Sequence, residues 1–207
     1  MAAFGGLTVL GISPDGKVSV TRLGLSVDLL EALEHNLLMF YTHDSRDATE
    51  ILARQDQATR RQDGHVVSAL REIKDIGLEI CGAITSGNLR RFGELMDLHW
   101  QAKKRLANGI SNPQIDAWYD LAKRNGAIGG KISGAGGGGF LMLYCEHSKN
   151  QLREAMRGAG LRELNFRFDF EGSKVVLDVL SRDGRLAHIQ RQTQGQNGHA
   201  LAARQAG

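Results

Sequence analysis

Apolar residues recur along the chain at two spacings, which predict a mixture of strands and helices. Residues 7–12 and 17–22 are rich in β-formers, and the Ser-Pro-Asp-Gly sequence between them is typical of a tight turn, so we expect a β-hairpin. Ser26 is placed to cap a short helix. The apolar block at 37–41 fits a buried strand or a helix end. We favour a strand, because polar residues flank the block on both sides.

Four longer stretches carry apolar residues at three- and four-residue steps, the spacing of an amphipathic helix. Asn88 and Asn112 stand where the third and fourth helices need an N-cap, and Pro113 fits the first helical position. His99 falls on the apolar face of the third helix and is expected to lie in the core. The helices are expected over residues 45–59, 65–85, 89–107 and 113–124.

The last third of the chain returns to strand patterns. Strands are expected over residues 127–133 and 140–145, followed by a helix over 150–157. Another strand is expected over 174–180, and the glutamine- and glycine-rich chain after residue 190 has too few apolar groups to fold. Strict alternation predicts one more half-buried strand before residue 174. Its apolar members are Leu164, Phe166, Phe168 and Phe170.

Composition narrows the class of protein. Of 207 residues, 42% are hydrophobic and 24% charged, so a packed core is expected and wholesale disorder is not. The formal net charge of +3 is too small to imply nucleic-acid binding. The sequence contains no run of about 18 apolar residues, so a membrane partner is not expected. Cys81 and Cys145 lie in apolar stretches, so we expect two buried thiols in a reducing, cytoplasmic setting. The order of the predicted elements indicates an α+β fold.

The most informative segment is the glycine-rich run at 129–140, Gly-Gly-Lys-Ile-Ser-Gly-Ala-Gly-Gly-Gly-Gly-Phe. Glycine costs conformational entropy, so such a run needs a reason. One reason is that backbone N–H groups must approach a phosphate closely, with Lys131 adding charge and Ser133 a hydroxyl donor. The alternative is a tight crossing between two strands, with no ligand.

Other known motifs fit less well. Gly134, Gly136 and Gly139 match G-x-G-x-x-G, but a strand follows them, whereas a dinucleotide site requires a helix. No Lys-Ser or Lys-Thr pair follows the glycines, which argues against a P-loop. The histidines lack the spacing of a zinc site. The G-x-S-x-G motif of serine hydrolases is also missing. No metal ligand is therefore assigned.

Taken with other segments, the run resembles a known family. Residues 129–145 are similar to the third, C-terminal motif of the GHMP small-molecule kinases, above all the heptose phosphate kinases and related sugar kinases. Residues 2–6 resemble the alanine-glycine stretch that follows the family's catalytic segment. Residues 41–48 resemble its strand-to-helix turn, although His43 stands where glycine is usual. Residues 100–113 are similar to the helix pair that leads into the glycine motif.

The resemblance implies a fold and a function. It implies an α+β, GHMP-kinase C-terminal-type domain over residues 41–183, with a sheet packed against a helical bundle. A remnant of the N-terminal domain over 1–40 would precede it, and a disordered tail over 184–207 would follow. The implied activity is that of an ATP-dependent sugar kinase acting on a heptose phosphate, which transfers the γ-phosphoryl group to a sugar hydroxyl when the N-terminal half is present. ATP and Mg²⁺ are the implied cofactors.

The resemblance also implies site residues. It assigns no catalytic residue, because the family's ATP-phosphate loop and catalytic aspartate have no counterpart here, so the chain alone is expected to be inactive. Arg46 can clamp a phosphate or lie in solvent, and Lys103 can contact a phosphate or belong to a solvated helix face. The implied phosphate- or nucleotide-binding residues are Ser133, Gly134, Ala135, Gly136, Gly137 and Gly138, and the substrate-binding residues are Thr42, Ser45, Arg46 and Lys131.

Two other functions remain open. The chain can be a non-catalytic sugar-phosphate- or nucleotide-binding or assembly module, which binds a separate N-terminal kinase half or a second copy of itself. It can also be a small regulatory domain whose glycine loop is purely structural. The hairpin at 7–22 is expected to pair with strands outside this sequence, which would leave apolar surface exposed and favour association.

Overall fold

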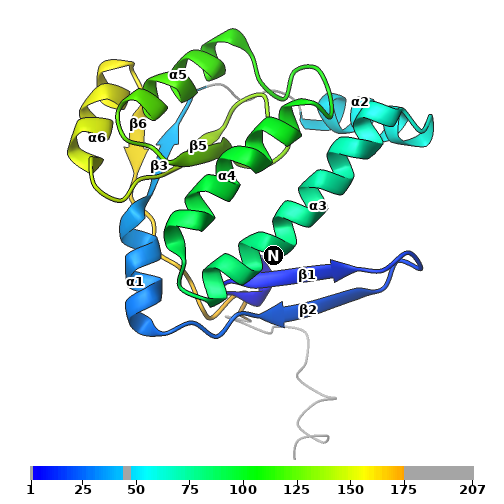
Figure 1. The fold of residues 1–207 in the computed structure, drawn as a ribbon, viewed down its shortest axis with the longest axis horizontal. Helices are drawn as coiled ribbons and strands as arrows, with labels where there is room; N and C mark the ends of the chain where they lie inside the picture. Colours follow the sequence, from blue (N-terminus) through cyan, green and yellow to red (C-terminus); the bar gives the residue numbers. More distant parts are fainter. Residues whose placement is uncertain (1, 44–47, 175–207) are drawn as a thin grey trace, which may run out of the picture.

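The computed structural model describes residues 2–43 and 48–174, which form an α+β structure (Figure 1). The chain begins with a short 3₁₀ turn and an antiparallel hairpin, as the turn sequence predicts. A helix capped by Ser26 follows and leads directly into the strand expected at 37–41. These elements are η1 (Ala2–Phe4), β1 (Thr8–Ile12), β2 (Val18–Arg22), α1 (Val27–Asn36) and β3 (Leu37–Tyr41).

A four-stranded antiparallel sheet forms the centre of the molecule, in the order β4-β5-β3-β6. The register places Met142 of β5 between Lys131 of β4 and Met39 of β3. The domain boundary expected between residues 40 and 41 falls inside β3, an inner strand of this sheet, and the division itself stays a prediction. The other strands are β4 (Gly129–Ile132), β5 (Phe140–Tyr144) and β6 (Arg162–Leu164).

The helices form where the apolar periodicity predicts them. Asn88 accepts a hydrogen bond from the N–H of Arg91 at 3.1 Å, and Asn112 accepts one from Ile115 at 2.9 Å, so both expected N-caps are confirmed. Pro113 opens its helix as expected. The helices after β3 are α2 (Ala48–Arg60), α3 (Gly64–Thr85), α4 (Leu89–Lys104), α5 (Pro113–Arg124) and α6 (Lys149–Gly158).

Both faces of the sheet are covered because its strands alternate between two cores. One core packs Leu38, Leu141 and Leu143 against α5 and α6. The other packs Leu37 and Tyr144 against α1 and α4. In Figure 1, α3 and α4 run side by side, with α4 next to the sheet. The sheet therefore holds α4 at a fixed distance from β4.

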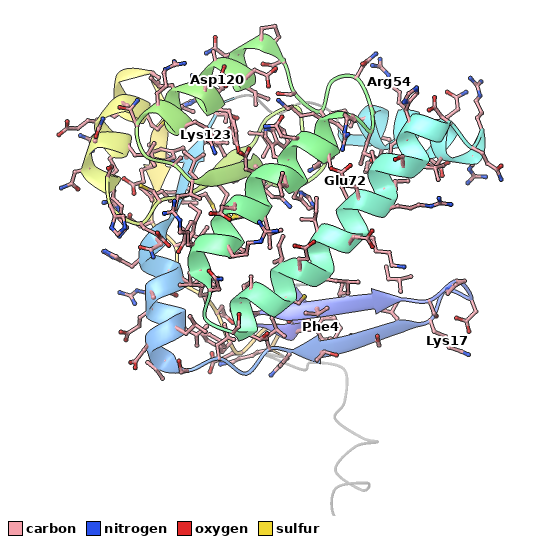
Figure 2. All side chains as sticks on the ribbon, viewed as in Figure 1. Phe4, Lys17, Arg54, Glu72, Asp120 and Lys123 are labelled. Carbon is pink, nitrogen blue, oxygen red and sulfur yellow. The ribbon has the colours of Figure 1, made fainter. Side chains whose placement is uncertain are left out.

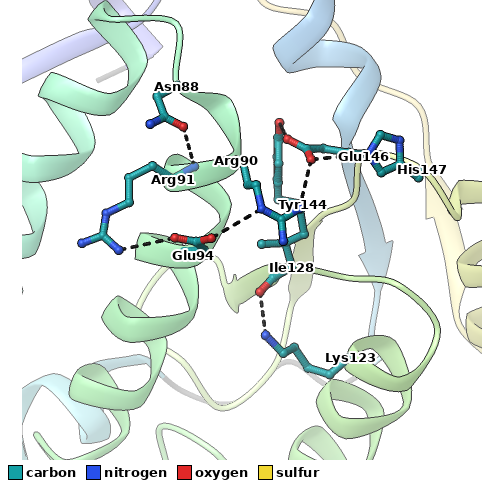
Figure 3. A network of polar contacts seen from close by, with 9 residues as sticks. All are labelled: Asn88, Arg90, Arg91, Glu94, Lys123, Ile128, Tyr144, Glu146 and His147. Carbon is teal, nitrogen blue, oxygen red and sulfur yellow. Dashed lines mark hydrogen bonds and ion pairs between the residues drawn. The ribbon is translucent and has the colours of Figure 1, made fainter.

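A polar network ties α4 and α5 to the strands (Figure 3). Arg90 of α4 lies 3.6 Å from Glu146, which also accepts a hydrogen bond from the Tyr144 hydroxyl at 3.2 Å. Lys123 of α5 donates to the Ile128 carbonyl at 2.6 Å, just before β4. These contacts fix both helices against the strands that flank the glycine run.

The prediction of a half-buried strand from the alternating phenylalanines is wrong. The last described strand, β6, ends at Leu164, and residues 165–174 form no ladder. The N–H of Phe168 donates to the Glu34 carboxylate of α1 at 2.6 Å, and the N–H of Gly6 donates to the Asp169 carbonyl at 2.5 Å. The segment thus crosses α1 and the N-terminal turn, and Phe166 packs there on the second core. The apolar positions reflect this packing and not strand pairing.

Smaller differences concern helix ends and cysteines. The helix expected over residues 89–107, α4, ends at Lys104, earlier than expected. Cys145 is buried, but Cys81 is half-exposed, so its expected burial is wrong. The strand expected at 174–180 lies outside the described residues except for its first position, and the tail expected at 184–207 lies wholly outside them. Nowhere in the described ranges does a helix combine the length and apolar character needed to cross a bilayer.

The hairpin of β1 and β2 stands apart from the rest. Within residues 2–43 and 48–174 its strands pair only with each other. Ile12 is 72% exposed and Val18 is 57% exposed, near the turn that carries Lys17. Figure 2 shows Lys17 at the tip of the hairpin and Phe4 near its base. Apolar side chains on this hairpin thus face solvent.

Candidate functional site

The glycine-rich run forms the loop between β4 and β5, here called the glycine loop (residues 133–139). The backbone has a positive φ of +83° at Gly134 and +98° at Gly139, where a Cβ would meet no other atom within 4 Å. Those glycines serve backbone conformation alone. Gly136 differs, because a Cβ there would lie 2.8 Å from the Ile110 carbonyl oxygen. Close packing therefore explains part of the glycine content without any ligand.

Neighbouring segments anchor the glycine loop at three points. The N–H of Gly137 donates to the Ile110 carbonyl at 2.9 Å, and the N–H of Ser133 donates to the Phe140 carbonyl at 2.8 Å. The backbone N–H and the side-chain hydroxyl of Thr42 both donate to the Gly139 carbonyl, at 2.9 and 3.0 Å. Thr42 is only 3% exposed. Its hydroxyl thus anchors the loop.

Several loop amides have no acceptor. Within the described residues, the N–H groups of Gly134, Ala135, Gly138 and Gly139 donate no hydrogen bond. Gly138 is nevertheless buried. Buried N–H groups nearly always find a partner, and successive free amides in a glycine-rich turn form a concavity suited to an anion. The loop geometry therefore fits a phosphate group.

Two lysines lie beside the glycine loop. The Lys103 ammonium, at the end of α4, donates to the Gly134 carbonyl. Lys131 follows Gly129 by two residues on β4, so its side chain leaves the same face of the strand. That face packs on α4, because a Cβ on Gly129 would lie 2.0 Å from the Gly93 carbonyl oxygen. Burial, with Lys131 nearby, lowers the pKa of Lys103 to about 8, and burial also lowers the pKa of Lys131.

His99 completes the cluster, one helical turn before Lys103. Its Nδ1 atom is buried and has no hydrogen-bond partner among the described residues. Leaving such a group unsatisfied costs about 1–3 kcal/mol. Burial, followed by the charges of Lys131 and Lys103, lowers the pKa of His99 to about 4, so the imidazole is neutral at pH 7. It therefore differs from the core histidine with satisfied hydrogen bonds that the sequence predicts.

The nearby carboxylates are committed elsewhere. Asp97 lies 3.0 Å from the Lys123 ammonium, and also accepts a hydrogen bond from the Tyr119 hydroxyl at 2.7 Å. Lys104, the neighbour of Lys103, lies 3.2 Å from Asp116. In the described part of the chain, no carboxylate pairs with His99, Lys103 or Lys131. These three bases, here called the basic cluster, lie beside the glycine loop with no counter-charge from the described residues.

The structure brings together most of the residues that the resemblance implies. Ser133, Gly134, Ala135, Gly136, Gly137 and Gly138 share the glycine loop, Lys131 precedes it, and Thr42 is bonded to its end. Ser45 and Arg46 lie outside the described residues. Lys103 is half-buried and bonded to the loop, which favours the phosphate-contact alternative over the solvated helix face. The sequence did not place His99 in the site. Its four-residue spacing from Lys103 on one helix face is a signal that could have done so.

The turn after β3 shows the effect of histidine at a glycine position. His43 has a φ of +58°, a conformation that glycine adopts freely and other residues rarely do. Its ring packs against Tyr41, with the ring centroids 4.9 Å apart. His43 thus adopts a backbone conformation that favours glycine.

The fit to cofactors differs between phosphate and metal. Free amides and uncompensated cations fit the phosphate groups of ATP or of a phosphorylated sugar. For Mg²⁺ the described residues provide no cluster of three or more His, Cys, Asp or Glu side chains. No step of a reaction is therefore derived through a metal.

Comparisons with known proteins agree with this geometry. Residues 66–161 match the family described as GHMP kinases C terminal. A curated D-glycero-alpha-D-manno-heptose 7-phosphate kinase from Campylobacter jejuni is 27% identical over 174 residues, which is 84% of this chain and 51% of the relative. An L-fucokinase/L-fucose-1-P guanylyltransferase from Bacteroides fragilis is 32% identical over 116 residues, which is 56% of this chain and 12% of the relative.

The fold has a solved counterpart in mevalonate kinase from L. major, crystallised with R-mevalonate. The TM-score is 0.64 at 16% identity, over 83% of this chain and 51% of that one. This chain spans about half the length of the heptose phosphate kinase that it matches. Residues 66–161 thus match a GHMP kinase C-terminal domain, and the family resemblance and the α+β fold class expected from the sequence are confirmed.

Proposed function

We propose that this chain supplies the C-terminal portion of a sugar kinase that phosphorylates a heptose phosphate with ATP. The observation that carries the proposal is the glycine loop, whose free amides lie beside Lys103 and Lys131. The similarity to a heptose 7-phosphate kinase supports the substrate class. Free amides and lysines serve phosphoryl transfer by positioning phosphates and neutralising their charge.

In this proposal each part of the site has a role. The free amides of Gly134, Ala135 and Gly138 bind phosphate oxygens, and Lys131 neutralises their charge. Thr42 holds the end of the loop in place, while Ser45 and Arg46 complete the sugar-phosphate side. A general base, the Mg²⁺ ligands and the rest of the ATP site come from an N-terminal half. The reducing cytoplasm is the proposed location, consistent with the free buried thiol of Cys145.

Titration of the full chain tests this function. Heptose 7-phosphate and ATP are added separately while the amide signals of Gly134 and Gly139 are followed by NMR. We expect either ligand to shift these signals, with the amides of the hairpin turn as an internal control. A loop that responds to neither ligand would leave the glycines with a structural role and overturn the proposal.

A coupled ATPase assay addresses catalysis. The chain alone, given heptose phosphate, ATP and Mg²⁺, should show no phosphotransfer, because no general base has been assigned to it. Robust turnover by pure material would contradict the need for an N-terminal half.

A second candidate is a non-catalytic assembly module, and the exposed hairpin favours it. Ile12 and Val18 face solvent on strands that pair only with each other in the described part of the molecule. Such a surface suits a second protein chain, either a separate kinase half or another copy. The NMR titration distinguishes the two candidates. An assembly module would associate through the hairpin, and its glycine loop would not respond to ATP or sugar phosphate.

A further inference from the structure

The basic cluster has an unusual charge arrangement for the inside of a protein. His99 and Lys103 occupy successive turns of α4, and Lys131 projects towards them from β4. Among residues 2–43 and 48–174, the side chain of Lys131 forms no hydrogen bond or ion pair, and the Nδ1 atom of His99 is buried without a partner. Removing charge from water without a partner costs free energy. An anion beside these side chains would supply the counter-charge.

We propose that His99, Lys103 and Lys131 form a binding subsite for a phosphate monoester at the base of the glycine loop, and that binding adds a proton to His99. This inference rests on the proposed function and specifies which side chains receive a phosphate in it. The proton comes from the solvent, and no covalent bond is made or broken.

The charges favour a phosphate monoester over other anions. A monoester carries between 1.5 and 2 negative charges near pH 7. The two lysines supply matching positive charge, whereas a carboxylate would leave one lysine uncompensated. The free N–H groups of Gly134 and Ala135 offer further donors on the loop that Lys103 contacts. A phosphate has enough oxygens to accept from both the loop and the cluster.

The proposed proton uptake follows from the surroundings of His99. The imidazole is neutral at pH 7 because burial and two neighbouring cations oppose its charge. A phosphate oxygen in contact with the Nδ1 atom would accept a hydrogen bond from the protonated imidazole and offset both the burial and the two cations, so a proton on the imidazole becomes favourable. The charged groups on the elements around it are otherwise engaged: Asp97 with Lys123 and Tyr119, Lys104 with Asp116, and Glu72 with Arg105. The incoming phosphate is therefore the counter-charge to which His99 responds.

Isothermal titration calorimetry on the full chain provides the test. Inorganic phosphate, heptose 7-phosphate and ATP are titrated separately at pH 7 in two buffers of different ionisation enthalpy, which yields the number of protons taken up. We expect proton uptake in at least one arm, and the arm with the tightest binding identifies whether the sugar phosphate or the nucleotide supplies the group. In that arm, K103M and K131M should each weaken binding by about tenfold, and H99Q should reduce the proton uptake.

Lys104→Met is the matched control. It removes the same charge from the adjacent position of α4, but Lys104 is paired with Asp116, so binding should stay within about twofold of the parent chain. Circular dichroism checks that each variant is folded. An independent readout on the parent chain needs no variant: the imidazole nitrogen signals of His99 should move from neutral to protonated values when the ligand is added.

The outcomes separate this inference from the function beneath it. If a ligand shifts the loop amides while K103M and K131M bind it as the parent does, the subsite is wrong and the kinase function stands. An unchanged His99 signal at saturating ligand overturns the proton step. If no ligand shifts the loop in the parent chain, the subsite and the proposed function both fail.

Discussion

The glycine loop and the hairpin of β1 and β2 both join antiparallel strands through turns that contain glycine at positive φ, yet their surroundings differ. At Gly16 in the hairpin turn, a Cβ would meet nothing within 4 Å. At Gly136 in the loop it would strike the backbone of Ile110, and at Gly129 before the loop it would strike the backbone of α4. The hairpin turn needs glycine only for conformation, whereas the loop region also needs it for close packing.

The two regions also differ in the kind of side chain that lacks a partner. Beneath the loop, His99, Lys103 and Lys131 are partly removed from solvent, with no counter-charge among residues 2–43 and 48–174. On the hairpin, Ile12 and Val18 lie in solvent without an apolar partner. Burying uncompensated charge and exposing apolar surface both reduce stability. The loop region is therefore suited to an anion, and the hairpin is suited to another protein surface.

The largest contrast is expected from replacing glycine by alanine at matched positions. Gly129→Ala should lower the free energy of unfolding by about 3 kcal/mol or more, because the new Cβ lies 2.0 Å from the Gly93 carbonyl oxygen and one backbone must move. Gly16→Ala should cost only about 1 kcal/mol, the strain of its φ of +80°. Urea unfolding measures both. Equal effects would mean that close packing of α4 on β4 is not what requires glycine.

A second contrast concerns pH. His99 titrates at an ordinary value of 6.5 when unfolded and at about 4 when folded. Between these values the unfolded chain binds a proton that the folded chain does not, so stability falls as the pH drops from 6.5 to 4. The loss should approach about 2–3 kcal/mol at pH 4, relative to H99Q measured under the same conditions. Identical pH profiles of the two proteins would contradict the buried neutral imidazole.

Removing a buried cation should stabilise the region that holds it. Lys131→Met deletes an unpaired charge while keeping the length of the side chain, and should raise the free energy of unfolding by about 1 kcal/mol. The same change should weaken phosphate binding, which is typical of a residue kept for function at the expense of stability. Thermal melts with and without phosphate measure both effects. A destabilised variant would show that Lys131 has a structural role instead.

The smallest effect on stability is expected on the hairpin. Ile12→Thr combined with Val18→Thr should change the free energy of unfolding by less than about 0.5 kcal/mol, since both side chains are exposed. It should nevertheless reduce concentration-dependent association, measured by light scattering after size exclusion. Val27→Thr, which alters a residue 68% exposed outside the hairpin, serves as the control. Association that persists in the double variant would place the contact elsewhere.

Much of the fold was predictable because local signals and tertiary packing agree. The Ser-Pro-Asp-Gly turn, the caps at Asn88 and Asn112, and the apolar block at 37–41 all formed as expected. The alternating phenylalanines gave a wrong prediction of a strand, because the same alternation also fits an irregular segment packed along a helix. Contacts between residues distant in sequence, such as that between Phe168 and Glu34, distinguish the two.

The sequence by itself determined the order of the elements, the position of the glycine loop and the family that it resembles, because caps, turns and motifs act over a few residues. The tertiary structure alone decided that α4 lies on β4, which brings His99 and Lys103 to Lys131. Among residues 2–43 and 48–174 it gives these bases no carboxylate partner. It also decided which glycines serve backbone conformation and which serve close contact. Burial and electrostatic coupling depend on distances between segments far apart in the chain, which no local pattern encodes.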